Sequence, residues 1–142
     1  MTNHPSETIT RPSRRKEARG PRAFFYDIRD IPAVNLADLV TAGQVAIEGI
    51  EHFEDRISEK EILNPPTISL IQYTVAPGTR VPHHHHDCHQ IDFVLAGSLH
   101  YGDSKKVLTP GMGFFAPKGQ AYSWTAGPKA APCSRFTTRG TS

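Results

Sequence analysis

The stretch Pro77–Gly97, PGTRVPHHHHDCHQIDFVLAG, holds five of the eight histidines in this chain of 142 residues. It lies between two apolar segments, 67–75 and 91–95, which are bounded by turn-forming residues and are typical of β-strands. An expression tag lies at a terminus, so this internal position excludes that interpretation. The role of each histidine therefore depends on the side to which a strand would point it.

Residues two apart in a strand share a face, so His84 and His86 point to one side and His83 and His85 to the other. Only one of these pairs can face the interior of a barrel. Two imidazoles on one face can bind a single metal ion, and a neighbouring strand would supply a third donor after a tight reversal. The candidates for that donor are Asp87, His89 and Gln90.

Length and composition bound the class of protein. A chain of this length is expected to form one domain, with enough apolar core to fold without a metal or a disulfide. Its two cysteines, Cys88 and Cys133, match neither a disulfide framework nor a zinc knuckle, which favours a reducing environment. We find no secretory leader and no apolar run long enough to span a bilayer, so we expect a cytoplasmic protein.

Residues 1–21 contain almost no large apolar side chain, which predicts a disordered N-terminal arm. Up to Arg22, six basic residues against two acidic ones give this end a charge of +4, whereas the whole chain carries +2. No aromatic residue interleaves the basic ones, so we expect a solvated arm that binds neither nucleic acid nor membranes. The folded domain is expected to span 22–142.

From residue 23 onward, short β-branched and aromatic runs alternate with turns marked by Gly and Pro. Asn35 predicts the N-cap of a helix over 36–41 that is closed by Gly43, and the acidic stretch 51–61 is expected to be a solvated hairpin rim or loop. Many short strands and a single helix favour an all-β sandwich or barrel. The expected strands are 23–31, 67–75, 91–95, 98–101, 106–108, 112–116 and 123–125.

The spacing around the histidines resembles the first motif of the cupin superfamily. That motif runs glycine, five residues, His-x-His, three or four residues, glutamate, six residues, glycine. Counting from Gly78 places His84 and His86 at the two histidines and Gly97 at the final glycine. Gln90 stands where the motif has glutamate. The resemblance thus selects His84, His86 and Gln90 from the candidate donors.

The second cupin motif runs glycine, five residues, proline, x, glycine, two residues, histidine, and it is similar to GMGFFAPKGQAY. Gly111, Pro117 and Gly119 fall in register, but Tyr122 stands where the motif has histidine. Together the two motifs cover 78–124, about a third of the chain. The resemblance implies the cupin double-stranded β-helix, which is a jelly-roll barrel, and a homodimer.

In cupins, two or three histidines and a carboxylate bind a divalent metal ion, so the resemblance implies a site for Zn, Fe, Mn or Ni at His84, His86 and Gln90. The amide oxygen of Gln90 can bind a metal ion, but it brings no negative charge. An ion held by neutral ligands keeps more of its charge, which favours Lewis-acid chemistry over dioxygen chemistry. The alternative is a polar pocket without metal.

Two further residues are candidate catalytic groups. If Gln90 faces inward, strand parity directs Asp92 inward as well. A buried Asp92 would act as a general base or would orient a ligand, unless it only forms an ion pair with Arg80. Tyr122 is expected to be a neutral phenol that donates to substrate as a general acid, unless it merely fills the barrel.

Small cupins with glutamine in the acid position are similar to metal-dependent polyketide cyclases and to cupins that process sugar acids. We therefore expect a metal-dependent enzyme, a Lewis acid that acts on a small carbonyl-bearing molecule as a cyclase, isomerase or lyase. The expected partner is that small molecule. Two alternatives stay open, namely a cupin dioxygenase with a non-haem metal and a non-catalytic sensor that binds a small molecule.

Overall fold

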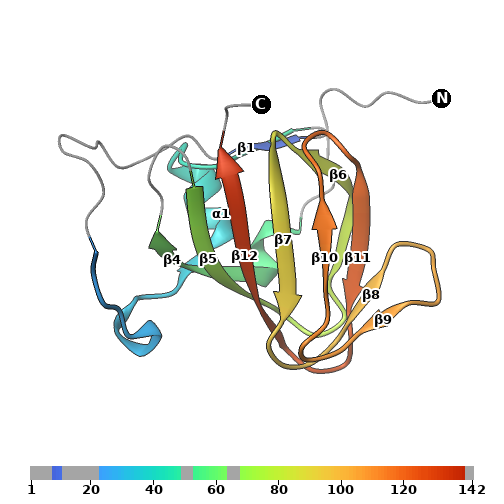
Figure 1. Ribbon diagram of the computed structural model, residues 1–142. Helices are drawn as coiled ribbons and strands as arrows, with labels where there is room; N and C mark the ends of the chain where they lie inside the picture. Colours follow the sequence, from blue (N-terminus) through green and yellow to red (C-terminus); the bar gives the residue numbers. More distant parts are fainter. Residues whose placement is uncertain (1–7, 11–22, 49–52, 64–67, 140–142) are drawn as a thin grey trace.

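The structure is a computed structural model, and it describes residues 8–10, 23–48, 53–63 and 68–139. Two six-stranded sheets face each other and form a barrel (Figure 1). The first sheet consists, in spatial order, of β3 (Ala46–Glu48), β1 (Thr8–Thr10), β6 (Arg80–His86), β11 (Tyr122–Ala126), β8 (Leu99–Tyr101) and β9 (Val107–Leu108). The second consists of β10 (Gly113–Ala116), β7 (Cys88–Val94), β12 (Ala131–Arg139), β5 (Ile68–Val75), β4 (Ile57–Leu63) and β2 (Val34–Asn35).

The strands of the second sheet alternate between buried and exposed side chains, as expected for a sheet with one face on a core. In β5 every second residue from Ser69 to Val75 is buried, and in β7 the buried residues are Gln90, Asp92 and Val94. β12 lies between these two strands and pairs antiparallel with both. The all-β fold class and the inward parity of β7 are thus confirmed.

The interior of the barrel has an apolar half and a polar half. Where β7 ends and β12 begins (Figure 1), the buried side chains are apolar, and Val75, Val94 and Ala131 are at most 2% exposed. Toward the opposite end, where β6 turns into β7, the buried side chains are mostly polar. They are Ser69, His84, His86, Gln90, Asp92, Arg135 and Thr137. The apolar half stabilises the barrel, and the polar half is where a reaction site can lie.

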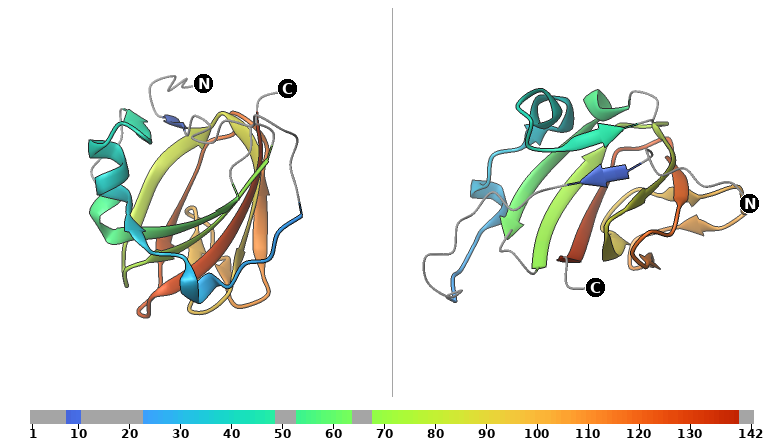
Figure 2. Two further views of the ribbon diagram at one scale, coloured as in Figure 1. Left: turned by 90° about the vertical axis from the view of Figure 1, so that its left-hand side faces the viewer. Right: turned by 90° about the horizontal axis from the view of Figure 1, so that it is seen from above.

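A short helix, α1 (Leu36–Thr41), lies against the side of the barrel near β4 and next to the 3-10 turn η2 (Glu54–Arg56) (Figure 2). The Asn35 side chain accepts a hydrogen bond from the Ala37 backbone N–H at 2.9 Å, and Gly43 has a φ of 75°. These are the start and end that the sequence predicts. The helix buries Leu36 and Leu39.

Among the described residues, no helix is both long enough and apolar enough to cross a lipid bilayer.

Two local predictions are wrong because capping and tertiary pairing decide the structure. The expected strand 23–31 instead contains the 3-10 turn η1 (Ile28–Asp30), because the Asp27 carboxylate accepts from the Arg29 backbone N–H at 2.9 Å and bends the chain. The expected loop 51–61 is a strand from residue 57 onward, in β4, where Glu59 is only 5% exposed. Residues 51 and 52 lie outside the described residues.

The expected disordered arm is wrong at one place. Thr8–Thr10 form β1, which pairs antiparallel with β3 and parallel with β6. The rest of 1–21 lies outside the described residues. The final strand, β12, is absent from the strands that the sequence predicts, and it supplies part of the polar half of the interior.

Candidate functional site

The histidine pair that strand parity selects points into the barrel. His84 and His86 are 1% and 6% exposed, and their ring centroids lie 5.1 Å apart. His83 and His85 alternate with them along β6 and face the other way. The inward orientation predicted for the pair is therefore confirmed.

The tautomer of His84 follows from its hydrogen bond. Its Nδ1 lies 2.7 Å from the carbonyl oxygen of Pro82, which can only accept, so Nδ1 carries the proton. Burial lowers the pKa of His84 to about 4, so the ring is neutral at physiological pH. The lone pair is then on Nε2, as a metal ligand requires.

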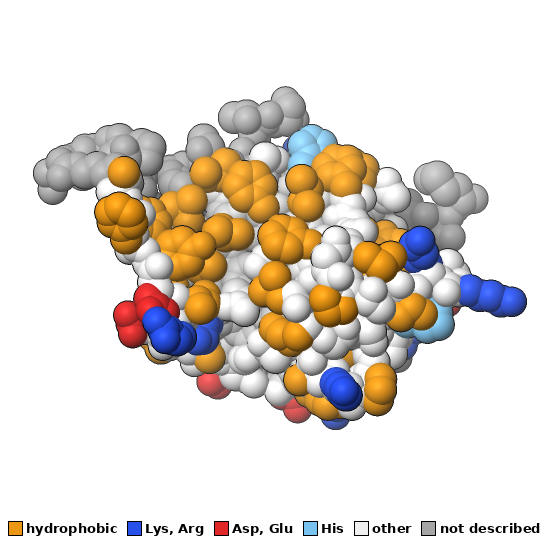
Figure 3. Space-filling view, turned by 60° about the horizontal axis from the view of Figure 1, so that its bottom comes forward, with side chains coloured by type: hydrophobic (Ala, Val, Ile, Leu, Met, Phe, Trp, Pro, Cys, Tyr) orange, Lys and Arg blue, Asp and Glu red, His pale blue; other side chains and the backbone are white. Residues whose placement is uncertain are grey.

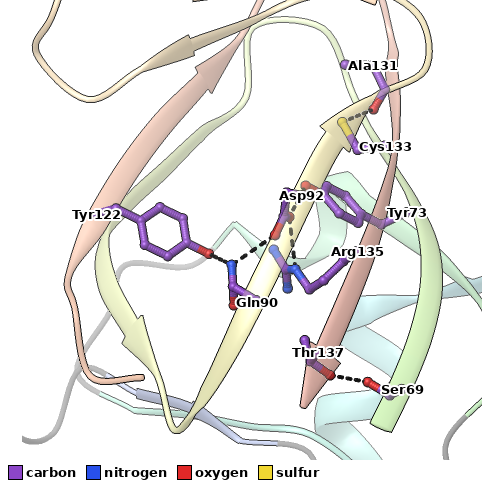
Figure 4. Close-up of polar contacts among 9 residues, drawn as sticks. All are labelled: Ser69, Tyr73, Gln90, Asp92, Tyr122, Ala131, Cys133, Arg135 and Thr137. Carbon is purple, nitrogen blue, oxygen red and sulfur yellow. Dashed lines mark hydrogen bonds and ion pairs between the residues drawn. The ribbon is translucent and has the colours of Figure 1, made fainter. Parts of the chain in front are cut away.

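Gln90 reaches into the barrel from the neighbouring strand β7 and is 1% exposed. Its Nε2 donates to Asp92 Oδ1 at 3.0 Å and to the hydroxyl of Tyr122 (Figure 4). Its Oε1 is buried and has no hydrogen-bond partner within the part of the chain that the structure describes. Both amide hydrogens are thus used, and the amide oxygen still has room for a ligand.

The other two candidate donors lie outside the barrel. Asp87 is exposed in the turn between β6 and β7, where it lies 3.6 Å from the ammonium group of Lys118. His89 is exposed as well, and its Nδ1 accepts from the backbone N–H of Lys118 at 3.0 Å. Among the three candidates, the structure brings only Gln90 to the histidine pair.

Asp92 forms the centre of a buried polar network (Figure 4). Its Oδ2 accepts from the Tyr73 hydroxyl at 2.6 Å and from Arg135 Nε at 2.9 Å, and its Oδ1 accepts from Gln90. The alternative prediction, an ion pair between Asp92 and Arg80, is wrong, because Arg80 is exposed at the start of β6. Arg135 lies directly opposite Asp92 in the pairing of β12 with β7.

The charges in this network are well defined. Burial by itself lowers the pKa of Arg135, but the negative charge of Asp92 outweighs it and the pKa lies well above its usual value. Arg135 Cζ also lies 4.9 Å from the centre of the Tyr73 ring. Burial, and next the charge of Asp92, raise the pKa of Tyr73, so its phenol is neutral. Asp92 and Arg135 therefore form a buried ion pair.

Tyr122 lies beside both histidines. It is opposite His84 in the pairing of β11 with β6, and its ring centroid is 4.6 Å from that of His84 and 6.2 Å from that of His86. Burial raises its pKa, which makes the phenol neutral as predicted. Tyr101 and Phe114 continue the aromatic wall, with centroids 6.1 and 5.2 Å from that of Tyr122.

No family model matches the chain, and no curated protein matches it in sequence. Solved structures do match. The polyketide cyclase RemF from Streptomyces resistomycificus superposes with a TM-score of 0.64 and 17% identity, over 82% of this chain and 80% of that one. An RmlC-like cupin from Shewanella frigidimarina gives 0.56 and 19%, over 65% and 84%. The DMSP lyase DddQ from Ruegeria pomeroyi gives 0.57 and 18%, over 66% and 53%. The chain has the cupin fold.

The donor set of this chain fits a metal ion. Within the described ranges, no three His, Cys, Asp or Glu side chains are placed to hold a metal, so a third ligand beside the histidines must be of another type. Gln90 Oε1 is such a group, because it is buried and needs a partner. Two neutral imidazoles and an amide oxygen suit a borderline divalent ion.

A small cavity of about 20 Å³ lies in the interior beside His84. Its polar lining includes Tyr73 and Arg135, and its apolar lining includes Trp124, whose buried Nε1 has no hydrogen-bond partner among the described residues. This volume accommodates about one water molecule. The cavity adjoins the candidate site through His84, which is the one proposed ligand among its lining residues, and the buried carboxylate of Glu59 lines it as well.

Sequence reasoning missed Arg135, the counterion of the site. The inward residues of β12 are small or polar, so their alternation carries little apolar signal. The available signal was the alternation of the apolar Phe136 with its polar neighbours, but Phe136 points to the outside of the barrel. The register with β7 then identifies the ion pair.

Proposed function

We propose that this chain is a metal-dependent cupin enzyme in which His84, His86 and Gln90 hold a divalent ion, Zn, Fe, Mn or Ni. The substrate is a small carbonyl-bearing molecule, and the reaction is of the cyclase, isomerase or lyase type. One observation carries the proposal. The amide oxygen of Gln90 is buried without a partner among the described residues, while its nitrogen is fully used by two acceptors.

The identity of those acceptors supports an orientation in which the amide oxygen is a ligand. An ion-paired carboxylate can only accept, so Gln90 has to turn its nitrogen toward Asp92 and its oxygen away. Asp92 already accepts from three groups, so we assign it a positioning role and not that of a proton acceptor. Of the two roles expected from the sequence, this is the orienting one.

The proposed ligands, two imidazoles and an amide, carry no net charge. A divalent ion bound there supplies Lewis acidity that polarises a substrate carbonyl, and neutral ligands leave that acidity largely undiminished. The nearest carboxylate, Asp92, is neutralised by Arg135. The neutral ligand set is what favours this chemistry over a dioxygenase.

Tyr122 is the candidate catalytic acid. Its hydroxyl oxygen accepts from Gln90, so the phenol hydrogen remains available for a substrate oxygen next to the histidines. Because burial raises its pKa, the phenol keeps its proton until negative charge develops on that oxygen. The aromatic wall of Tyr101 and Phe114 would bind the apolar part of the substrate and exclude water.

The solved structures that share the fold include one named as a polyketide cyclase and one named as a DMSP lyase. Both names describe transformations of small organic molecules and agree with the proposed reaction types. The likeness supports the fold, and the choice of chemistry rests on the residues of this chain.

The metal site can be tested with a matched pair of variants. Untagged protein is loaded with Zn²⁺ or Fe²⁺ and dialysed, and its metal content and thermal midpoint are measured. The inward variant His84→Ala/His86→Ala should lose the metal and the stabilisation that it confers, because ligand binding to the native state raises stability. The outward variant His83→Ala/His85→Ala removes two histidines from the same strand and should retain both. Equal metal content in all three proteins would refute the site.

Two further measurements separate the enzyme from its alternatives. Turnover of a carbonyl substrate that is lost in Tyr122→Phe, with metal still bound, supports the assignment of Tyr122. Consumption of dioxygen by the iron-loaded protein with substrate would point instead to a dioxygenase. Tight binding of a small molecule without turnover would point to a sensor.

A further inference from the structure

The cavity of about 20 Å³ beside His84 is enclosed by buried side chains from α1 and from both sheets. Its apolar wall consists of residues that are at most 5% exposed, namely Leu36, Phe53, Ile57 and Val81. Its polar wall consists of residues that are at most 8% exposed, namely Glu59, Tyr73, His84, Trp124 and Arg135. A hydrogen-bonding group that is left without a partner in such surroundings costs stability, because it has given up its contacts with water.

Two side chains of the polar wall have N–H groups without an acceptor. Trp124 is 2% exposed, and its Nε1 has no hydrogen-bond partner among the described residues. Arg135 donates from Nε to Asp92 Oδ2 at 2.9 Å (Figure 4), but its two Nη atoms have no acceptor in the part of the chain that the structure describes. An acceptor oxygen in the cavity would therefore satisfy donors from two strands.

The charges around the cavity decide which kind of oxygen fits it. Arg135 is already neutralised by Asp92, and a second carboxylate, that of Glu59, belongs to the wall. An anionic oxygen would face two carboxylates and one guanidinium, and a cation would offer nothing to the unpaired N–H groups. A hydroxyl is neutral, accepts through its oxygen and donates its hydrogen to a carboxylate. The cavity therefore suits a hydroxyl group.

His84 connects the cavity with the proposed metal site. It is the one proposed ligand in the cavity wall, and its Nδ1 lies 2.7 Å from the Pro82 carbonyl oxygen, which leaves Nε2 for the ion. The cavity and the proposed ion thus contact the same imidazole ring. A volume of about 20 Å³ accommodates about one oxygen atom, so a single water molecule or a single hydroxyl group fills it.

We propose that this cavity is a hydroxyl subsite. On the proposed function, which this inference deepens, the substrate carries a hydroxyl group in addition to its carbonyl group. While the carbonyl group is held beside the histidines, the hydroxyl replaces a water molecule in the cavity, accepts from Trp124 Nε1 and donates to Glu59. A site that hydrogen-bonds a hydroxyl discriminates against a molecule without it, because the buried groups are then left unpaired. Trp124 and Glu59 thus determine specificity.

The test follows the indole N–H of Trp124, which gives a single signal because the chain has one tryptophan. Full-length protein, labelled with ¹⁵N and loaded with Zn²⁺, is titrated with two sets of ketones. One set is hydroxyacetone with acetone as its parent, and the other is ortho, meta and para hydroxyacetophenone with acetophenone as the parent. In the free protein, the indole hydrogen should show a nuclear Overhauser effect to a long-lived water molecule.

At least one hydroxy ketone should abolish this water signal and shift the indole resonance. By calorimetry it should bind about 10-fold more tightly than its parent ketone, which is the contribution of roughly one buried hydrogen bond. Trp124→Phe removes the indole N–H and should reduce this preference to less than about threefold. Glu59→Leu removes the acceptor and should have the same effect, so it serves if Trp124→Phe does not fold, as verified by circular dichroism.

The control variant changes an aromatic residue on the outside of the barrel. Hydrophobic side chains cover much of the face of the molecule in Figure 3, and charged ones lie toward its edges. Phe115 on β10 is 58% exposed and is absent from the cavity wall. Phe115→Leu should therefore retain the preference for the hydroxy ketone.

Equal affinity of every hydroxy ketone and its parent for wild type would overturn the hydroxyl subsite, and so would a preference that survives both Trp124→Phe and Glu59→Leu. A water signal that persists at saturating hydroxy ketone would reduce the cavity to a site for water only, and the absence of any water or ligand signal would show that it is dry. Both results contradict the proposal. Failure of the metal site is distinguishable, because protein that does not bind Zn²⁺ should still exchange its cavity water for the hydroxyl group.

Discussion

Replacing Asp92 by asparagine removes one charge from the interior at nearly constant volume. In the native protein the carboxylate is 1% exposed and accepts from Tyr73, Gln90 and Arg135. Asparagine can accept through its oxygen, but its amide nitrogen would face one of these donors. The guanidinium of Arg135, whose side chain is 9% exposed, would keep its charge without a counterion.

Removing one partner of a buried ion pair costs about 3–5 kcal/mol. We therefore expect Asp92→Asn to lower the free energy of unfolding by about this amount, a large share of the ~5–15 kcal/mol that a domain commonly has. Urea unfolding in the presence of a chelator measures this loss without any contribution from metal. Arg135→Met and the double variant complete a cycle, and the loss in the double variant should fall short of the sum by about 1–3 kcal/mol.

The same variant tests the positioning role of Asp92. The amide introduced by Asp92→Asn can donate as well as accept, so the Gln90 amide can flip and turn its oxygen toward position 92. That oxygen is then no longer reserved for a metal ion. Metal affinity should fall about 10- to 100-fold, which is typical when a group that orients a ligand is changed. A loss of stability below about 1 kcal/mol would refute the ion pair as a structural element. Unchanged metal affinity in a destabilised variant would refute the orientation of Gln90 by Asp92.

Four further predictions concern Gly97, Cys133 and Gln90. Gly97→Ala should lower the free energy of unfolding in urea by about 1–3 kcal/mol more than Gly78→Ala does. Both glycines have φ near 70°, but only at Gly97 would a Cβ lie 2.6 Å from a backbone oxygen. Equal losses in the two variants would contradict this. Burial raises the pKa of the Cys133 thiol to about 12 from 9.0. In Cys88→Ser this remaining thiol should therefore resist a disulfide reagent until the protein unfolds. Prompt modification of the folded variant would contradict this. Above pH 9 the unfolded chain loses this proton and the folded one retains it, so stability should fall with rising pH by at most ~1.4 kcal/mol per unit. Gln90→Glu should bind Zn²⁺ more tightly, because it brings a negative charge to the ion. Without metal it should unfold more easily, because a second carboxylate then lies beside the buried carboxylate of Asp92. A metal-free variant as stable as wild type would contradict this.

The parts of the fold that are set by local chemistry could be predicted from the sequence. Asn35 is an N-cap in any context that allows a helix, and the alternation in β7 places Gln90 and Asp92 on the same face regardless of the partner strand. The parts that were missed depend on pairing. Glu59 is charged and yet buried in β4, and β12 presents small and polar residues inward, so neither strand shows the apolar alternation by which strands are recognised.

The role of Gln90 shows where sequence reasoning stops. Counting from Gly78 shows that Gln90 stands where the first cupin motif has a glutamate. The missing negative charge, taken alone, predicts weaker binding of a metal ion. The register of β7 with β12 adds that a carboxylate, Asp92, lies two residues further along the same face and is neutralised by Arg135. A carboxylate therefore lies beside the proposed ligand Gln90, where it accepts from the amide and is itself held by Tyr73 and Arg135. A site of this kind can be neutral and still well ordered, because the ion pair that costs desolvation also determines which atom of the Gln90 amide is left for a ligand.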